Sequence, residues 1–333
     1  MYDPATDIAI FSTCPPSASV EPAVFRRRVV EVARWSERHG CRGILVYTDN
    51  SLLDPWLVAQ LIVESTEALI PLVAIQPVYM HPYTVAKMIT TFGALYERSV
   101  YLNMVAGGFT NDLRALADTT EHNRRYDRLL EYTTIIKRLL EGQTVTFGGE
   151  FYRVERLRLA PPLDQALRPW IFVSASSPAG RAAARALDAV VVRYPTADDE
   201  TSAEPDGNDT MKGIRVGIVA RSDDAEAWRV AHGYFPEDRQ GQLAHALAMR
   251  TSDSLWHKQL GRAAPDTTPY WLTPFRNYKT FCPYLVGTYE RVARELARQL
   301  RDGVNAFILD VPREEADLAH ARIAFEHAAT EVV

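Results

Sequence analysis

The chain has 333 residues, of which 47% are hydrophobic and 24% are charged, and its formal net charge is −5. This is the balance of a globular protein, and it excludes a disordered tail protein and a disulfide-stapled peptide. Because no run of five like charges occurs, nucleic acid and anionic membrane surfaces are not expected as partners.

The regular elements alternate along the chain. Short β-branched runs are followed by longer helical patterns, which is typical of parallel βαβ units. The expected strands are residues 7–14, 43–48, 69–76, 100–106, 170–174, 189–194, 213–221 and 306–311. Helices are expected at residues 25–36, from 54, at 83–95, 122–141, 179–187 and 224–231, and from 314. Eight such units predict an α/β fold of the TIM (β/α)8 barrel type, although the count alone also fits a large doubly wound sheet.

Three stretches depart from this alternation. Residues 144–147 and 151–154 flank a Gly-Gly pair and predict a β-hairpin. Residues 196–210 are acidic, small and rich in turn formers, so we expect a mobile acidic loop there. Residues 233–288 separate the seventh strand from the eighth and are rich in aromatic residues and proline, so this insertion is a candidate lid. The whole chain, residues 1–333, is expected to form one barrel domain.

The cysteines and the N-terminus indicate the compartment. Cys14, Cys41 and Cys282 share no short spacing, which favours reduced thiols over a disulfide framework. The first residues hold no basic stretch followed by an apolar one. Apolar runs such as residues 69–75 are too short to cross a bilayer. We therefore expect a cytoplasmic protein.

Two serines mark a possible phosphate site. Ser176 and Ser177 lie where the fifth strand turns into its helix, so their hydroxyls and the helix N-terminus face one point. The alternative is that a serine caps the helix and binds no ligand. Tyr126, on the long helix at residues 122–141, could donate to the same phosphate, but it also shares the apolar face of that helix.

A glycine pair and an arginine lie near other strand ends. Gly107 and Gly108 follow the fourth strand, where they allow the backbone to approach a flat ring or simply form a turn, and Asn103 precedes them. Arg215 and Gly217 share one face of the seventh strand. An arginine inside a barrel requires an anion, which could be a substrate group, a flavin oxygen or a neighbouring carboxylate.

Other chemistries lack their motifs. The eight histidines form no H-x-H or H-E-x-x-H pattern, so the ligands of a metal hydrolase are not evident. The sequence has no G-x-S-x-G elbow, no Walker loop and no strand-borne G-x-G-x-x-G. Cys14 could lie at the end of the first strand, but no base for a nucleophile is evident, so we interpret it as lining a pocket.

These motifs, taken together and in this order, resemble the bacterial luciferase-like flavin monooxygenases, and most closely the alkanesulfonate monooxygenase branch. The resemblance implies reduced FMN as cofactor, supplied by a separate NAD(P)H-dependent flavin reductase, and a homo-oligomer, dimer or tetramer. It also implies a small organic substrate that is oxygenated with O₂, and no metal. The cofactor-binding residues carried over are Asn103, Ala106, Gly107, Tyr126, Ser176 and Ser177.

The substrate half of the motif set departs from that branch. Arg215 matches an active-site arginine, but Gly217 stands where the branch has a histidine. The active-site cysteine and tyrosine of the alkanesulfonate monooxygenase branch align with Leu52 and Val311. The mobile-loop arginine of that branch falls near Tyr278 and Lys279. We therefore expect Arg215 and Lys279 as catalytic residues, a substrate other than a simple alkanesulfonate, and a pocket lined by Cys14, Leu52, Gly217, Tyr278 and Val311.

Two alternative functions remain open on the sequence. Related barrels also host deazaflavin-dependent oxidoreductases that transfer hydride, and the loss of a histidine at Gly217 is compatible with a flavin-binding barrel without turnover. Fold alone does not decide among them.

Overall fold

The computed structural model describes residues 8–18, 20–175, 177–195, 211–251, 260 and 269–332. The chain divides into two compact units. The N-terminal unit comprises Cys14–Ala33 and Gly43–Val191, and the C-terminal unit comprises Met1–Thr13, Arg34–Arg42 and Val192–Val333. The expected acidic loop at residues 196–210 lies outside the described residues, as does much of the segment between 252 and 268.

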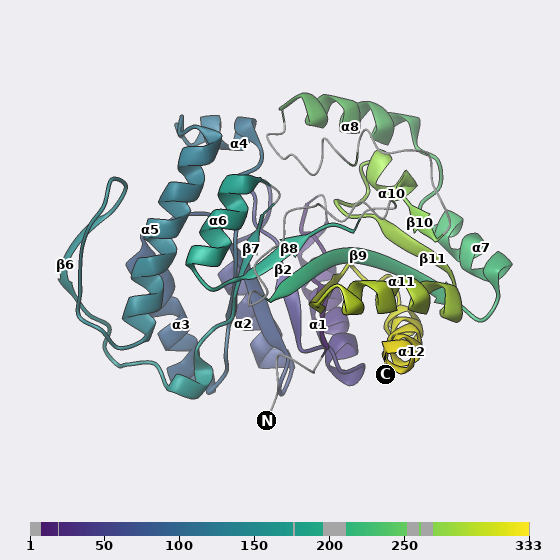
Figure 1. Cartoon of the computed structure of the whole chain (residues 1–333), viewed down its shortest axis with the longest axis horizontal. Helices are drawn as coiled ribbons and strands as arrows, with labels where there is room; N and C mark the ends of the chain where they lie inside the picture. Colours follow the sequence, from purple (N-terminus) through teal and green to yellow (C-terminus); the bar gives the residue numbers. More distant parts are fainter. Residues whose placement is uncertain are drawn as a thin grey trace. The chain divides into compact units, whose positions relative to one another are not determined.

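The N-terminal unit alternates strands and helices as the sequence predicts (Figure 1). Its strands follow the order β2-β3-β4-β7-β8, and the pairs β2–β3, β3–β4 and β4–β7 are parallel. The elements, with α1 and β8 each shared in part with the other unit, are α1 (Pro22–Arg38), β2 (Gly43–Val46), α2 (Pro55–Ser65), β3 (Ile70–Ile75), α3 (Pro82–Tyr96), β4 (Tyr101–Met104), α4 (Thr110–Ala115), α5 (His122–Leu140), β5 (Val145–Gly148), β6 (Arg153–Leu157), the 3-10 helix η1 (Gln165–Leu167), β7 (Ile171–Ser174), α6 (Pro178–Ala186) and β8 (Val190–Arg193).

Local signals explain where these elements begin. Asp54 caps α2 by accepting from the backbone N–H groups of Trp56 and Leu57, and Pro55 is the first helical residue. The predicted hairpin is confirmed as the antiparallel pair β5–β6, which lies outside α5 in Figure 1. The carboxylate of Glu131 accepts from the backbone N–H groups of residues 150–152 at 2.8–3.1 Å, and this fastens the hairpin turn to α5.

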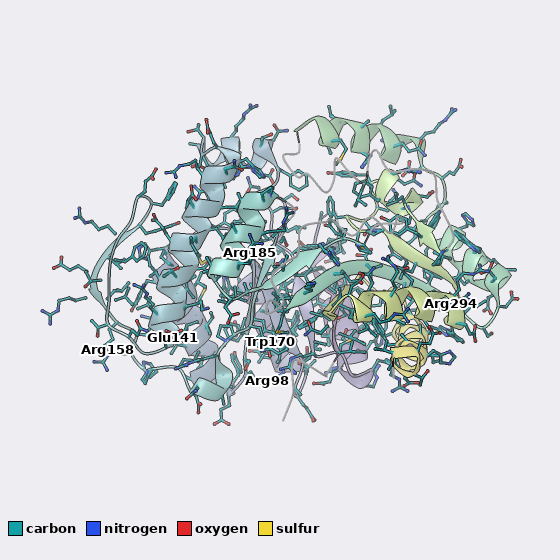
Figure 2. All side chains as sticks on the ribbon, in the orientation of Figure 1. Arg98, Glu141, Arg158, Trp170, Arg185 and Arg294 are labelled. Atoms are coloured by element: carbon teal, nitrogen blue, oxygen red, sulfur yellow. The ribbon has the colours of Figure 1, made fainter. Side chains whose placement is uncertain are left out.

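Packing closes the amino ends of the strands in this unit. The guanidinium of Arg98 donates to the carbonyls of Thr66 and Leu69 at 2.9 and 2.6 Å. Trp170, labelled with Arg98 in Figure 2, stacks on Tyr101 with a ring-centroid distance of 5.2 Å. Ligand sites of parallel α/β folds lie at the carboxyl ends of the strands, so this packed end fits a structural role.

The C-terminal unit contains the strand order β10-β11-β9-β12-β1. The long strand β9 changes its partner along its length. Residues 212–216 pair with β12, and residues 217–221 pair with β11. The elements are β1 (Ala9–Thr13), β9 (Lys212–Arg221), α7 (Asp224–Tyr234), α8 (Arg239–Thr251), β10 (Tyr270–Trp271), α10 (Thr273–Arg276), β11 (Tyr284–Thr288), α11 (Tyr289–Arg301), β12 (Val304–Leu309) and α12 (Glu315–Val332).

The region between the seventh and eighth barrel strands is more regular than the sequence predicts. It holds helix α8, the antiparallel pair β10–β11 and helix α11, which lies beside α12 in Figure 1. The second half of β9 therefore packs against this region: Val219 joins a core cluster with Trp271, Tyr284 and Val286. At Gly217 the strand β9 exchanges its partner from β12 to β11.

The eight parallel strands expected of the barrel are all present as β1, β2, β3, β4, β7, β8, β9 and β12. Helices separate most of them along the chain, and α12 closes the series. The fold is the predicted TIM (β/α)8 type.

Candidate functional site

Ser177 and Tyr126 form a polar cradle at the start of α6 in the N-terminal unit. Ser177 is buried and caps the helix, because its Oγ accepts from the N–H of Gly180 at 3.1 Å. Tyr126 on α5 is buried beside it. Burial raises the pKa of Tyr126, and a hydrogen bond with Ser177 and the charge of Arg125 act in the opposite direction. The serine thus fulfils its capping role and still contacts the tyrosine hydroxyl.

Close packing holds the two groups together. A Cβ at Gly180 would lie 2.9 Å from a ring carbon of Tyr126, so only glycine allows the ring this near the first turn of α6. Arg125 is 3% exposed, and its guanidinium donates to the carbonyl of Thr120 at 3.2 Å. A buried cation, two hydroxyls and a helix N-terminus are the donor set that a phosphate dianion requires.

Arg125 is a candidate site residue that the sequence analysis did not select. Its position directly before Tyr126 was visible, but in a helix consecutive residues point in different directions, and the sequence gives no sign that this arginine is buried. The other serine of the pair, Ser176, lies outside the described residues.

The end of β4 carries the remaining residues expected to bind the cofactor. Asn103 is buried, and its Oδ1 accepts from the hydroxyl of Ser174 at 3.3 Å. Ala106 is buried in the apolar core of the unit and offers no hydroxyl. Gly107 has a φ of +100°, and a Cβ there would lie 3.0 Å from the side chain of Leu113. The backbone therefore needs glycine at this turn.

A cavity of about 290 Å³ opens at the carboxyl ends of β2 and β3. Leu52, predicted to line the substrate pocket, lies in its wall. Gln76 donates to the hydroxyl of Tyr79 at 3.2 Å, and this hydroxyl donates to the side chain of Asn50 at 2.9 Å. Burial, together with the charges of Asp112 and Asp49, raises the pKa of Tyr79 to about 12. The cavity wall thus combines apolar and polar side chains.

Cys14 follows β1 and belongs to the N-terminal unit. It is 2% exposed, its backbone N–H donates to the carbonyl of Leu45 at 2.8 Å, and burial raises the pKa of its thiol. A thiol whose pKa is raised by burial is not a ready nucleophile. This agrees with its interpretation as an apolar lining residue.

In the C-terminal unit, Arg215 faces a carboxylate at the end of β12. Its Nη2 lies 3.7 Å from Oδ1 of Asp310, and both side chains are about nine-tenths buried. The other oxygen of Asp310 accepts from the hydroxyl of Tyr284 at 2.8 Å. Of the three anions that the sequence left open for Arg215, the structure thus supplies the neighbouring carboxylate.

Tyr284 also explains the glycine at position 217. The two residues are register partners in the β9–β11 pair, and a Cβ on Gly217 would overlap the tyrosine ring. The phenol therefore occupies the space that a side chain at 217 would need. The sequence analysis missed Tyr284 and Asp310, because each lies far from Arg215 along the chain and neither belongs to a local motif.

The remaining predicted residues lie elsewhere in the C-terminal unit. Val311 follows Asp310 and lines a small cavity with Tyr284. Lys279 is 42% exposed and forms an ion pair with Asp238, with 2.5 Å between Nζ and Oδ2. Tyr278 is partly exposed and packs against the rings of His245 and Phe281. Lys279 is thus held by a carboxylate of its own segment and not by Asp310.

The predicted residues therefore fall into three groups. The first group lies in the N-terminal unit and comprises Cys14, Leu52, Asn103, Ala106, Gly107, Tyr126 and Ser177. The second group lies around Asp310 and Tyr284 and comprises Arg215, Gly217 and Val311. The third, Tyr278 and Lys279, lies with α8 and α10. Within the part of the chain that the structure describes, no group of three His, Cys, Asp or Glu side chains could hold a metal ion. No helix among those same residues is long and apolar enough to span a membrane.

Comparison with known proteins places these features in a family. The family model described as luciferase-like monooxygenase matches residues 6–306. A monooxygenase of Niallia circulans, BtrO, named for 4-(gamma-L-glutamylamino)butanoyl-[BtrI acyl-carrier protein], is 35% identical over 307 residues, which cover 89% of each chain.

Solved structures agree in fold. The EDTA monooxygenase of Chelativorans sp. BNC1 has a TM-score of 0.70 at 14% identity, over 98% of this chain and 95% of that one. A long-chain alkane monooxygenase has a TM-score of 0.73 at 15% identity, over 98% and 91% of the two chains. On the strength of the family match and the 35% identity, this chain belongs to the luciferase-like monooxygenase family.

Proposed function

We propose that this protein is a two-component monooxygenase that takes reduced FMN from a separate NAD(P)H-dependent flavin reductase and oxygenates an organic substrate. The observation that carries the proposal is the buried cradle of Ser177, Tyr126 and Arg125, which has the donors and the positive charge for a flavin phosphate. Reduced FMN would supply the electrons with which O₂ is activated.

The chain's own residues would bind and orient. The hydroxyls of Ser177 and Tyr126 would donate to the phosphate while Arg125 balances its charge. Gly107, which no larger residue could replace, would let the backbone approach a flat ring. Arg215 would hold an anionic group of the substrate or stabilise negative charge that develops on it. The buried apolar residues around Ala106 would keep water away from the reaction.

The substrate that we propose is not a simple alkanesulfonate. A sulfonate is a compact anion that requires converging cations and donors. Around Arg215 the structure offers a carboxylate, Asp310, and a glycine at 217 that supplies no side chain. Lys279 is held by Asp238. The acyl substrate in the name of the relative BtrO supports a larger organic substrate for this chain as well.

Titration with the two redox states of FMN tests the cofactor. We expect tighter binding of reduced than of oxidised FMN, and a dissociation constant raised about tenfold or more by Ser177→Ala or Tyr126→Phe, because each removes a donor to a buried dianion. The control is Glu141→Gln, an exposed residue labelled in Figure 2 that caps the C-terminal end of α5, whereas Tyr126 lies near the start of that helix. If the double variant Ser177→Ala with Tyr126→Phe binds FMN as tightly as the wild type, the phosphate site must lie elsewhere.

Turnover tests the reaction. With FMN, NADH and a generic reductase, octanesulfonate is expected to release no sulfite above a control without enzyme. Robust sulfite release would overturn the proposed substrate class. The hydride-transfer alternative is tested by replacing FMN with a deazaflavin. That alternative predicts that the substrate reduces the deazaflavin whether or not O₂ is present.

A further inference from the structure

The cavity at the ends of β2 and β3 combines apolar walls with negative charge. Its lining includes the apolar residues Leu52, Trp56 and Ile75 and the polar residues Asp49, Asp54 and Gln76. Its volume of about 290 Å³ is enough for a small organic group. No lysine or arginine lies among the described residues that line it.

The carboxylate of Asp49 is held in place at the cavity wall. Oδ1 of Asp49 accepts from the backbone N–H and the hydroxyl of Ser51, both at 2.7 Å, which fixes the carboxylate at the cavity wall. Burial and the charge of Asp49 raise the pKa of Asp112, and both charges raise the pKa of Tyr79. The negative charge of Asp49 thus acts on Tyr79 in the same cavity wall and on Asp112 nearby.

Gln76 adds an acceptor to the same cavity. It is 7% exposed, and its Nε2 donates to the hydroxyl of Tyr79 at 3.2 Å. This bond directs the amide nitrogen toward Tyr79, so the amide oxygen is the acceptor of this side chain, and it lies 3.5 Å from the place that a Cβ would take at Gly107. An amide oxygen can accept from an N–H donor of a ligand.

We propose that this cavity binds the primary ammonium group of an amine-bearing substrate, with Asp49 as its charged partner and Gln76 as a second acceptor. An ammonium has three donors and no acceptor, which complements a wall that offers oxygens and no cation. The indole of Trp56 adds an aromatic surface of the kind that attracts cations. The proposal rests on the proposed function, because it takes this cavity as part of the substrate site.

The test compares two probes that differ in charge. Hexylammonium and 1-hexanol are titrated by calorimetry into the full chain without flavin, at about pH 7, where an alkylamine carries its positive charge. We expect the wild type to bind hexylammonium about tenfold or more tightly than hexanol. Asp49→Asn keeps the shape and removes the charge, so it is expected to bring the two affinities within about twofold of each other.

Controls keep the result interpretable. Glu141→Gln removes one exposed negative charge and is expected to keep the full preference for the amine. If Asp49→Asn fails to fold by circular dichroism, Gln76→Leu takes its place and is expected to weaken hexylammonium binding several-fold. Equal binding of both probes, no binding of either, or a preference unchanged by these variants would overturn the inference.

This readout is independent of the flavin. If the wild type shows no preference for the ammonium probe but binds FMN normally, the proposed ammonium site is rejected and the proposed function stands. A retained preference without FMN binding would reject the proposed function instead.

Discussion

Each unit of this protein contains a buried pair of an arginine and an aspartate, and the two pairs differ in geometry. In the N-terminal unit, Arg128 and Asp118 are 2.7 Å apart, and Asp118 also accepts from the N–H and the hydroxyl of Thr120. In the C-terminal unit, Arg215 and Asp310 are 3.7 Å apart, beyond hydrogen-bond distance, and Asp310 accepts from Tyr284.

The difference indicates different roles. The pair of Asp118 is local in sequence, and its carboxylate is bonded to both Arg128 and Thr120, as is typical of a group that fixes a turn, here the one between α4 and α5. The pair of Asp310 joins β9 to the residue after β12 and shares its carboxylate with a phenol. The charge of Arg215 is thus balanced by a carboxylate that lies beyond hydrogen-bond distance and has a second donor.

The largest effect is expected from Asp310→Asn. This variant leaves the buried guanidinium of Arg215 beside a neutral amide, and breaking a buried pair from one side costs about 3 kcal/mol or more in the free energy of unfolding. Denaturant unfolding measures it. The double variant Arg215→Met with Asp310→Leu is expected to be less destabilised than the single one, because no charge is left unpaired. A loss below about 1 kcal/mol would show that Asp310 does not neutralise Arg215.

Gly217→Ala is expected to cost about 2 kcal/mol, because the new methyl group would overlap the ring of Tyr284. Combining it with Tyr284→Leu is expected to recover part of that loss, although Asp310 then loses its donor. Thermal unfolding of the single and double variants gives the comparison. Equal stability of Gly217→Ala and wild type would mean that the tyrosine ring moves aside easily, and that position 217 does not depend on it.

The sequence predicted those elements that depend on neighbouring residues and missed those that depend on residues far apart in the chain. Asp54 and Ser177 were recognised as helix starts from adjacent residues, and both act as caps. The strands of the N-terminal unit were placed within a few residues for the same reason. Strand β11 was missed, because Tyr284–Thr288 stands in an aromatic, proline-rich stretch and becomes a strand only by pairing with β9.

The candidate site divides in the same way. Ser177 and Tyr126 were selected from local patterns, and the structure brings them into contact. Arg215 was selected as an arginine that requires an anion, but its partner could not be named, since Asp310 belongs to another strand. The charge of Lys279 was expected in the substrate site, and its ion pair with Asp238 could not be read from spacing. Burial and long-range pairing are the information that one sequence lacks.

The dependence of stability on pH in acid tests the contrast between the Arg128–Asp118 pair and the Arg215–Asp310 pair. Hydrogen bonds with Arg128 and Thr120 overcome the opposing effect of burial and lower the pKa of Asp118 from 3.8 to about 2. Its contribution to stability is therefore complete above the ordinary value and is lost as the pH falls through about 2. We expect Asp118→Asn to lower the free energy of unfolding by about 2 kcal/mol near neutral pH. Between pH 4 and 2 the variant is expected to lose less of its remaining stability than the wild type loses. Parallel acid curves for the two proteins would contradict this.

The smallest effect is expected from Tyr284→Phe, which keeps the ring over Gly217 and removes only the donor to Asp310. A hydrogen bond to a charged group contributes about 1.5 kcal/mol, so the variant is expected to lose about that much in denaturant unfolding. A double-mutant cycle with Asp310→Asn separates this bond from the ion pair, because in the Asn background the phenol no longer faces a charge and its removal is expected to cost less than about 1 kcal/mol. If Tyr284→Phe costs the same in both backgrounds, the contribution of the hydroxyl does not depend on the charge of Asp310, and Asp310 neutralises Arg215 without help from the phenol.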